Sequence, residues 1–276
     1  MSGKLLVKPS APDAQGRIHA ITPESAGWSY VGFAVHLMKP RQTLSFSAGE
    51  SELCFVLVAG VAKMSVDGKD FGQLGQRMSP FDGPPWALYA PKGSNIVIEA
   101  TSDVELAVCS SPGGGDFKPR VIAPTPEAQL TRGTGTNTRY PYNILPEDEP
   151  AHSLLVVEVI TPGGNWSSYP PHKHDRDAWP DETYLEETYY HRLNRPRGFA
   201  LQRIYTDDGS IDETLAASDR DVVLAPKGYH PVGAPHGYDL YYLNVMAGPK
   251  RAWKFHVHPD FRWIAGMTSE PAATKT

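Results

Sequence analysis

Short hydrophobic runs alternate with turn residues along the whole chain. The 25 Gly and 26 Pro residues separate runs rich in Val, Ile, Leu, Tyr and Phe, the residues that strands favour. No window keeps an apolar period of 3.6 residues for three turns, so we expect few and short helices. Strands are predicted at residues 54–58, 95–99, 104–108, 154–160 and 240–245. Many short strands with frequent turns indicate an all-β sandwich or barrel, and jelly rolls are among the common solutions.

The chain also repeats itself. The tetrapeptide Ala-Pro-Lys-Gly occurs at residues 90–93 and again at 225–228, an offset of 135 residues. The same offset places Glu187 over Glu52, each followed by aromatic residues. Two anchors that share one offset favour a duplicated domain. We predict an N-terminal domain, a Pro-, Gly- and Thr-rich linker and a C-terminal domain, at residues 1–123, 124–150 and 151–276.

Composition and charge exclude several classes of protein. With 40% hydrophobic and 21% charged residues the chain is typical of a globular protein. The net charge is −5 and no basic stripe interleaves with aromatic residues, so nucleic acid is not an expected partner. We expect no membrane association and a cytoplasmic location, because no signal-type segment opens the chain and no run reaches roughly 18 apolar residues. Cys54 and Cys109 lie in apolar runs and are expected to be free thiols.

Histidine is concentrated in the second half, where seven of the ten residues lie between 172 and 258. His172 and His174 are two residues apart on an extended segment, so both imidazoles point to one face. Imidazole is the commonest metal ligand at neutral pH. A carboxylate from the pair Glu186-Glu187 and a third imidazole from His230 would complete a shell that leaves positions open for substrate.

The first copy of the repeat lacks these candidate ligands. Carried back by 135 residues, the three histidines fall on Leu37, Lys39 and Asn95. The first copy keeps the turn sequence but has no His-x-His pair and no His after its Pro-Lys-Gly. We therefore predict an N-terminal domain without metal ligands, which is structural or forms one wall of an interface, and a C-terminal domain that carries the chemistry.

These motifs resemble those of known proteins. His-x-His, a later Glu that opens an aromatic strand, and Pro-x-Gly followed by His look like the two signature motifs of the cupin superfamily. The longer segments 163–175, 186–192, 199–206, 226–232 and 241–248 resemble the 5-deoxy-glucuronate isomerase family of bacterial myo-inositol catabolism. They are similar more distantly to 4-deoxy-L-threo-5-hexosulose-uronate ketol-isomerase. The resemblance is strong over about residues 150–264 and weak in the first half.

The resemblance implies a fold, a reaction and a set of ligands. The fold would be a bicupin, two double-stranded β-helix barrels from a duplicated domain. The reaction would be the aldose–ketose isomerisation of 5-deoxy-D-glucuronate to 5-dehydro-2-deoxy-D-gluconate. The metal ligands would be His172, His174, Glu187 and His230. Such a set suits Zn²⁺ first, and Mn²⁺, Fe²⁺ or Ni²⁺ as well.

The acidic ligand has competitors, because a generic cupin has its Glu three or four residues after the second His. Here residues 175–186 intervene, so three other acids compete with Glu187: Asp177, Glu182 and Glu186. The repeat favours Glu187, because Glu52 keeps the same distance to its Pro-Lys-Gly turn. His236 is a nearby alternative to His230, whereas His256 and His258 are not expected to bind metal because no acidic strand follows them.

Isomerisation through an enediol sets further requirements. A divalent metal on the C1 and C2 oxygens would stabilise the enediolate, and a base would move the proton between these carbons. The candidate bases are Glu186 and a metal-bound hydroxide. A fixed cation would bind the substrate carboxylate, and Arg suits because of its bidentate fork. Arg203 is our first candidate, since it lies in a predicted strand and can point into the barrel; weaker ones are Arg192, Lys250 and Lys254. Further polar residues expected in the wall are Tyr190, Tyr241 and Lys173.

Two other functions stay open at this point. The same four ligands would permit a metal-dependent cupin oxygenase, and a non-catalytic sugar-binding bicupin is the third hypothesis. The expected partner is a small sugar acid. A homo-oligomer, most simply a dimer, is also expected, because exposed sheet edges commonly pair.

Overall fold

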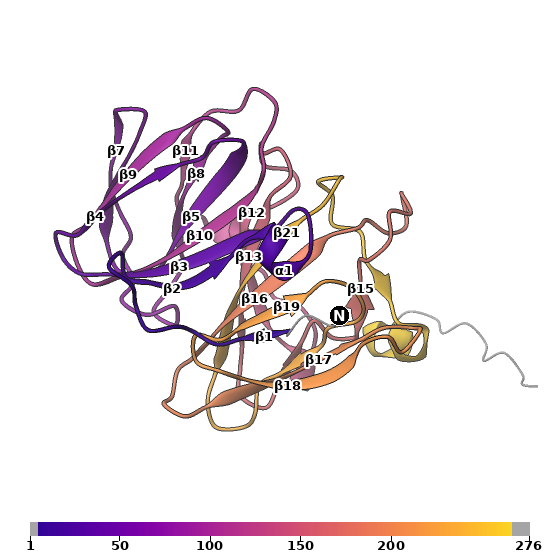
Figure 1. Ribbon diagram of the computed structural model, residues 1–276. Helices are drawn as coiled ribbons and strands as arrows, with labels where there is room; N and C mark the ends of the chain where they lie inside the picture. Colours follow the sequence, from indigo (N-terminus) through magenta and orange to yellow (C-terminus); the bar gives the residue numbers. More distant parts are fainter. Residues whose placement is uncertain (1–4, 267–276) are drawn as a thin grey trace, which may run out of the picture.

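The computed structural model describes residues 5–266, and it confirms an all-β protein. Figure 1 shows two lobes, one of indigo to magenta strands and one of mainly orange to yellow strands. Within the described residues, helical structure is limited to four short elements: α1 (Pro23–Ala26), η1 (Pro126–Ala128), η2 (Gly135–Asn137) and η3 (Pro259–Ala265). None of these helices is long and apolar enough to cross a membrane. The five predicted strands are confirmed as β5 (Ser51–Ala59), β9 (Asn95–Ala100), β10 (Val104–Pro112), β13 (Leu155–Thr161) and β21 (Leu240–Ala247).

The first half of the chain forms two antiparallel sheets. The six-stranded sheet has the order β11-β8-β5-β10-β3-β2, and its other strands are β2 (Arg17–Ile21), β3 (Gly32–Met38), β8 (Trp86–Ala90) and β11 (Arg120–Ile122). The four-stranded sheet has the order β4-β9-β6-β7, with β4 (Thr43–Ser47), β6 (Ala62–Val66) and β7 (Lys69–Leu74). Apolar side chains from both sheets form one buried cluster that includes Leu44, Phe55, Met64, Ile96 and Leu106. The interior of the first barrel is therefore a hydrophobic core.

The second half repeats this arrangement strand for strand. Its six-stranded sheet has the order β1-β19-β16-β21-β13-β12, with β1 (Leu6–Val7), β12 (Tyr140–Leu145), β16 (Glu186–Leu193) and β19 (Val222–Ala225). Its four-stranded sheet has the order β14-β20-β17-β18, with β14 (Trp166–Ser167), β17 (Phe199–Tyr205), β18 (Asp212–Ser218) and β20 (Val232–Gly233). A further pair joins β15 (His172–Lys173) to β22 (His256–Val257). The matching strand orders are those expected of a duplicated barrel.

Two strands of the second sheet come from outside residues 151–276. β1 pairs with β19, so the start of the chain completes an edge of the second sheet, as Figure 1 shows. β12 pairs with β13, although it lies in the segment predicted as a linker. The boundaries at 1–123, 124–150 and 151–276 stay a prediction.

The two halves meet through their six-stranded sheets. One buried cluster contains side chains from both, including Phe33, Val56, Tyr89, Val156, Tyr190 and Tyr241. Cys54 and Cys109 lie in the same cluster as free, buried thiols, as expected. Residues of the six-stranded sheets are thus buried on both faces, one against the other half and one in their own barrel.

The register of the repeat differs by one residue from the sequence prediction. Leu53 pairs with Ala90, and Glu187 pairs with Ala225, where the two alanines open the repeated tetrapeptides. Leu53 is therefore the counterpart of Glu187, and Glu52 is the counterpart of Glu186. Neighbouring residues of a strand point to opposite faces. A shift of one residue therefore places Glu52 on the face between the halves and not in the barrel interior, where Glu187 lies.

Glu52 and Glu186 make the same contact in opposite directions across this face. Glu52 accepts hydrogen bonds from the backbone N–H groups of residues 152–154 at 2.6–2.8 Å. Glu186 accepts them from residues 29–31 at 2.7–3.0 Å. These two loops precede the equivalent strands β13 and β3. Each half thus holds a loop of the other with a buried carboxylate, an arrangement we call the reciprocal clasp.

The reciprocal clasp predicts two similar losses of stability. Replacing either Glu52 or Glu186 by Gln puts an amide NH₂ against buried backbone donors, so we expect each variant to lose about 2 kcal/mol of unfolding free energy. Urea denaturation of both variants measures the loss. A loss confined to one of them would contradict the equivalence of the two contacts.

Candidate metal centre

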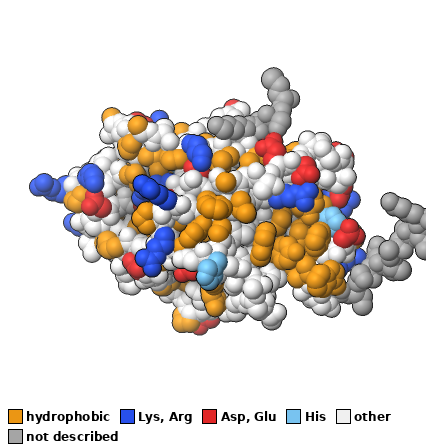
Figure 2. Space-filling model, turned by 90° about the horizontal axis from the view of Figure 1, so that it is seen from below, with side chains coloured by type: hydrophobic (Ala, Val, Ile, Leu, Met, Phe, Trp, Pro, Cys, Tyr) orange, Lys and Arg blue, Asp and Glu red, His pale blue; other side chains and the backbone are white. Residues whose placement is uncertain are grey.

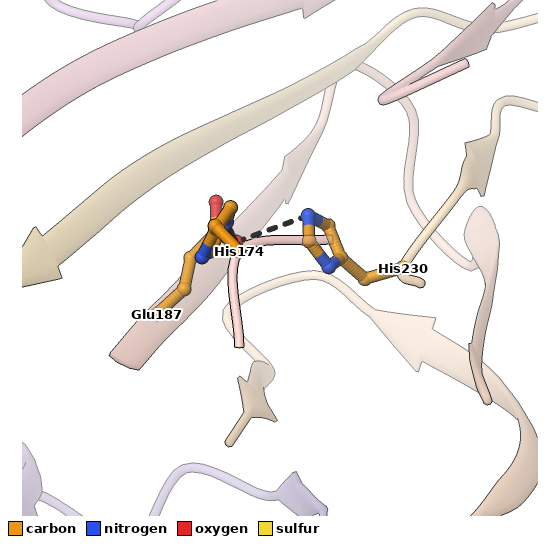
Figure 3. Close-up of side chains that lie close together, drawn as sticks. All are labelled: His174, Glu187 and His230. Carbon is orange, nitrogen blue, oxygen red and sulfur yellow. Dashed lines mark hydrogen bonds and ion pairs between the residues drawn. The ribbon is translucent and has the colours of Figure 1, made fainter. Parts of the chain in front are cut away.

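The structure brings three of the four predicted ligands together. The ligand atoms of His174, Glu187 and His230 lie within 4.8 Å of one another, and all three residues are buried. His174 Nε2 is 2.9 Å, and His230 Nε2 is 3.2 Å, from the same carboxylate oxygen of Glu187. In Figure 3 His174 and Glu187 lie together, and His230 points toward them from the other side. Two imidazoles and one carboxylate therefore converge on a single point.

The local backbone aims these side chains. His174 follows β15, Glu187 is the second residue of β16, and His230 follows a tight turn before β20. Gly228 forms this turn with a φ of +85°, and a Cβ there would lie 2.4 Å from the carbonyl oxygen of Tyr205. Only glycine fits so close an approach at positive φ, which explains the Pro-Lys-Gly sequence before His230.

His172, the fourth predicted ligand, lies beside the cluster. Its ring centroid is 4.9 Å from that of His230 and 6.4 Å from that of His174. The ring of Phe255 packs against it at 4.6 Å. His172 thus borders the group of three from the side on which a pocket opens.

All three histidines turn Nδ1 toward a backbone carbonyl oxygen. The pairs are His174 with Leu185 at 3.0 Å, His230 with Gly228 at 2.8 Å, and His172 with Pro170 at 3.4 Å. Since a carbonyl oxygen can only accept, Nδ1 carries the proton and Nε2 keeps its lone pair for a ligand. Nε2 of His230 is buried and has no hydrogen-bond partner among the described residues, although it lies beside the Glu187 carboxylate. An orphaned imidazole nitrogen next to a carboxylate fits a divalent metal ion.

The charges of the cluster also suit a metal. Burial opposes ionisation of Glu187, but His230 and His174 lower the pKa of this carboxyl to about 2. Asn244 donates a hydrogen bond to its other oxygen. Burial, together with the neighbouring imidazoles, lowers the pKa of His172 well below its usual value, and burial also lowers the pKa of His230. An ionised carboxylate and neutral imidazoles are the forms that bind metals.

His174 differs from the other two histidines in its protonation. Burial opposes its charged form, but the Glu187 carboxylate outweighs burial and raises the pKa of His174. A proton therefore competes with a metal ion for Nε2 of His174. We expect metal affinity to fall as the pH is lowered, because the proton then competes better for Nε2. Titration of metal content by equilibrium dialysis between pH 8 and pH 5.5 measures this effect; an affinity that rose toward acid pH would contradict it.

The alternative ligands lie elsewhere. Glu182 pairs with Arg176 at 2.7 Å and accepts a hydrogen bond from the backbone of Asp175. Asp177 and His236 are exposed. Glu186, the last alternative, belongs to the reciprocal clasp.

Glu186, a candidate base, and Tyr190, expected in the wall of the site, face the other half of the molecule. Glu187 and Tyr189 point into the second barrel, so Glu186 and Tyr190 point the opposite way. The Tyr190 hydroxyl donates a hydrogen bond to Glu105 of the first half at 2.8 Å. Strand parity therefore separates both residues from the metal cluster.

Arg203 and Lys173 also point away from the cluster. Arg203 pairs with Asp212 at 2.8 Å and its side chain is 47% exposed, so the expectation that it points into the barrel is wrong. Its neighbour Gln202 is buried instead and lies 2.9 Å from Nε2 of His191. Lys173 lies between the two histidines of the motif, faces the opposite way and pairs with Asp207 at 2.7 Å.

The weaker candidates have other partners. Arg192 pairs with Glu105, Lys254 with Glu147, and Lys250 packs over Trp179. The Tyr241 hydroxyl donates to Glu158, on the side that faces the first half. His258 packs against the ring of Tyr229 at 4.6 Å.

A pocket of about 260 Å³ opens beside His172. Polar side chains that line it include Arg132, Arg139, Asn143, Ser168 and Tyr242. None of them was predicted from the sequence. Tyr189 was not predicted either. It lies on the same face of β16 as Glu187, two residues further along, and its hydroxyl oxygen is 3.1 Å from that of Ser168. The period of two could have indicated Tyr189, whereas Arg139 lies in the segment interpreted as a linker.

Comparisons with known proteins find relatives over nearly the full length of the chain. Relatives named 5-deoxy-glucuronate isomerase include one from Geobacillus kaustophilus (strain HTA426), 52% identical over 271 residues and 98% of each chain. The one from Bacillus subtilis (strain 168) is 43% identical over 94% of this chain and 98% of its own. The crystal structure of an iolb-like protein from Salmonella typhimurium LT2 superposes with a TM-score of 0.91, at 49% identity over 95% of this chain and 99% of that one.

The fold extends to more distant proteins. Oxalate decarboxylase OxdC of Bacillus subtilis, at 12% identity, reaches a TM-score of 0.65 over 97% of this chain and 82% of its own, which supports the bicupin fold alone. The sequence profile of the KduI/IolB family matches residues 5–264. Together with relatives 43–52% identical over nearly the full length, this match shows that the chain belongs to the KduI/IolB family.

Proposed function

We propose that this protein is an aldose–ketose isomerase that converts 5-deoxy-D-glucuronate to 5-dehydro-2-deoxy-D-gluconate in myo-inositol catabolism. The observation that carries the proposal is the buried cluster of His174, Glu187 and His230, in a chain whose nearly full-length relatives are named 5-deoxy-glucuronate isomerase. The adjoining pocket supplies polar side chains of the kind that a sugar acid requires.

One divalent metal ion belongs to this proposal. We assign His172, His174, Glu187 and His230 as its ligands and Zn²⁺ as the first candidate, with Mn²⁺, Fe²⁺ and Ni²⁺ as alternatives. The convergence of three ligand atoms and the Nδ1 contacts of the three imidazoles support the assignment. When bound, the ion would polarise the substrate carbonyl and stabilise the charge of the enediolate.

The protein itself must position the substrate and handle the proton. Asn244 holds Glu187, and the backbone carbonyls orient the imidazoles, so the ligand set is rigid before substrate binds. The pocket lining contains no Asp or Glu among the described residues. With His172 assigned to the metal, this leaves Ser168, Tyr169 and Tyr242 as the pocket side chains able to donate or relay a proton at the substrate carbons. Burial raises the pKa of Tyr242, which keeps its hydroxyl protonated and suited to donation.

A direct assay tests the proposal. Metal-loaded protein is incubated with 5-deoxy-D-glucuronate and followed by ¹H NMR. We expect the C1 aldehyde (or hemiacetal) signal of the substrate to disappear as the hydroxymethyl signal of the product appears. Metal-loaded protein that produces no ketose would overturn the proposal. Oxygen consumption with Fe²⁺ would favour an oxygenase, and carbohydrate affinity in protein without metal would favour a sugar-binding protein.

We propose further that the protein works as a homodimer in the cytoplasm. Several large hydrophobic side chains are exposed, among them Trp166, Phe199, Leu201, Trp179 and Trp263. Figure 2 shows one face on which hydrophobic side chains gather with Lys and Arg between them. Exposed apolar patches of this kind are typical of interaction sites. Light scattering coupled to size-exclusion chromatography measures the mass, and a monomer would contradict the dimer.

A further inference from the structure

Two arginines line the pocket beside the metal cluster, and neither pairs with a carboxylate among the described residues. Arg132 and Arg139 face each other across a backbone bridge of two 3.0 Å hydrogen bonds. The guanidinium of Arg139 donates to the backbone oxygen of Asn137 at 3.1 Å and to its side-chain oxygen at 3.4 Å. The buried guanidinium of Arg77, by contrast, pairs with Glu158.

Arg139 is partly removed from water without compensation by an anion. Burial lowers the pKa of Arg139, and the charge of Arg132 lowers it further, while Tyr242 acts in the opposite direction. A cation in such surroundings is stabilised when an anion binds to it. The pocket therefore contains an anion-binding group whose partner is absent from the described protein residues.

The position of Arg139 is built into the backbone. Gly133 has a φ of +76°, and a Cβ there would lie 2.0 Å from the Asn137 carbonyl oxygen and 2.8 Å from Nη1 of Arg139. The side chain of Asn165 donates a hydrogen bond to the carbonyl oxygen of Thr138 at 2.8 Å, which ties this hairpin to the second barrel. The arginine is thus held by a tight, anchored turn, as a preorganised site requires.

A chain of aromatic contacts connects Arg139 with the metal cluster. Arg139 and Tyr242 interact electrostatically, and the Tyr242 ring lies 5.0 Å from that of Tyr189. The Tyr189 ring lies 5.9 Å from that of His230. Arg139, Tyr242 and His172 line one pocket, and His172 borders the cluster at its contact with His230.

We propose that Arg139 binds the substrate carboxylate and selects a sugar acid over a neutral sugar, while the aldehyde end reaches the metal cluster. The inference rests on the proposed function, which supplies a substrate with an aldehyde at C1 and a carboxylate at C6. The planar guanidinium offers two parallel N–H donors, which match a carboxylate. Arg139 takes the role that the sequence analysis gave to Arg203.

The kinetic test compares Arg139→Gln with Arg203→Gln, which removes a guanidinium from the exposed outer face of β17. In Arg139→Gln we expect KM for 5-deoxy-D-glucuronate to rise about 10- to 100-fold, because a charge-assisted hydrogen bond to the substrate is lost. The metal content should not change. Arg139→Lys keeps the charge without the fork and should recover part of the loss. Arg203→Gln should match the wild type. An unchanged KM in folded Arg139→Gln would overturn the proposal.

A binding test separates this proposal from the proposed function. Wild-type protein with bound metal is titrated calorimetrically with D-glucuronate and with neutral D-glucose. We expect the wild type to prefer glucuronate by about 10-fold or more, and Arg139→Gln to lose this preference. Preference without isomerase activity would refute the isomerase but keep the carboxylate site. No preference in the wild type, or a preference that depends on Arg132 and not on Arg139, would overturn the assignment. Arg139→Lys serves the same comparison if Arg139→Gln does not fold.

Discussion

Substitution of His174 by Ala is expected to abolish both bound metal and isomerase turnover. Nε2 of His174 lies 2.9 Å from the Glu187 oxygen, at the point where the three ligands converge. Losing a group that merely orients a ligand typically costs 10- to 100-fold in affinity or activity, so loss of a ligand should cost more than about 100-fold. Elemental analysis gives the metal stoichiometry, and the NMR assay gives turnover.

The matched control is His236→Ala, which removes an exposed histidine from the same half. It should keep metal and activity. Glu187→Gln, which preserves size but removes the charge, should behave like His174→Ala. Because a ligand that binds only the folded state stabilises it, a chelator should lower the melting temperature of wild-type protein but not that of His174→Ala. Stoichiometric metal with normal turnover in folded His174→Ala would refute the site.

The largest loss of stability is expected at the buried ion pair that joins the two halves. Arg77 lies in the first half and Glu158 on β13, with two N–O distances of 2.7 Å and both side chains no more than 5% exposed. The Tyr241 hydroxyl donates to the same carboxylate at 3.0 Å. Burial opposes the charge of Arg77, but Glu158 outweighs burial and raises the pKa of Arg77, which keeps the guanidinium charged.

Arg77→Met leaves the Glu158 carboxylate buried without its partner, and we expect it to lose about 3–5 kcal/mol of unfolding free energy. The double variant Arg77→Met/Glu158→Leu should recover much of this loss, because no buried charge is then left alone. Denaturant unfolding of both variants measures the difference. The exposed pair of Arg203 and Asp212 is the control, and its removal should change little. A single variant as stable as wild type would show that the pair does not couple the halves.

Sequence motifs identified the residues whose positions follow from their immediate neighbours in the chain. They did not identify the residues whose positions depend on distant segments. His174 and His230 are placed by short segments, a two-residue spacing and a glycine turn, whose geometry follows from adjacent residues. Glu187 was chosen through a repeat register that is one residue wrong, since its structural counterpart is Leu53. The choice nevertheless selected the acid in the cluster. The correct register equates Glu52 with Glu186, which belongs to the reciprocal clasp and not to the cluster.

The face assignments failed for a physical reason. β16 is buried on both faces, against the other half and inside its own barrel, so its sequence shows no alternation of polar and apolar residues. The polar and apolar pattern therefore does not show which residues face the barrel. Only the choice of Glu187 as a ligand sets the parity, which points to Tyr189 and away from Glu186 and Tyr190.

Arg203 shares one face of β17 with Phe199 and Leu201, so the sequence pattern favoured the inward face. In the structure this face is exposed, and Ala200, Gln202 and Ile204 are buried instead.

The sequence by itself determined the all-β class, the duplication, the loss of ligands in the first copy and the histidines of the second, because these depend on composition, turn chemistry and short spacings. Tertiary structure alone decided which half β1 joins, which acid faces the cluster and which arginine reaches the pocket. Glu186 meets residues 29–31, and Arg139 enters from a segment that resembles a linker. Such contacts join segments far apart in the chain, and only the packing of complete sheets brings them together.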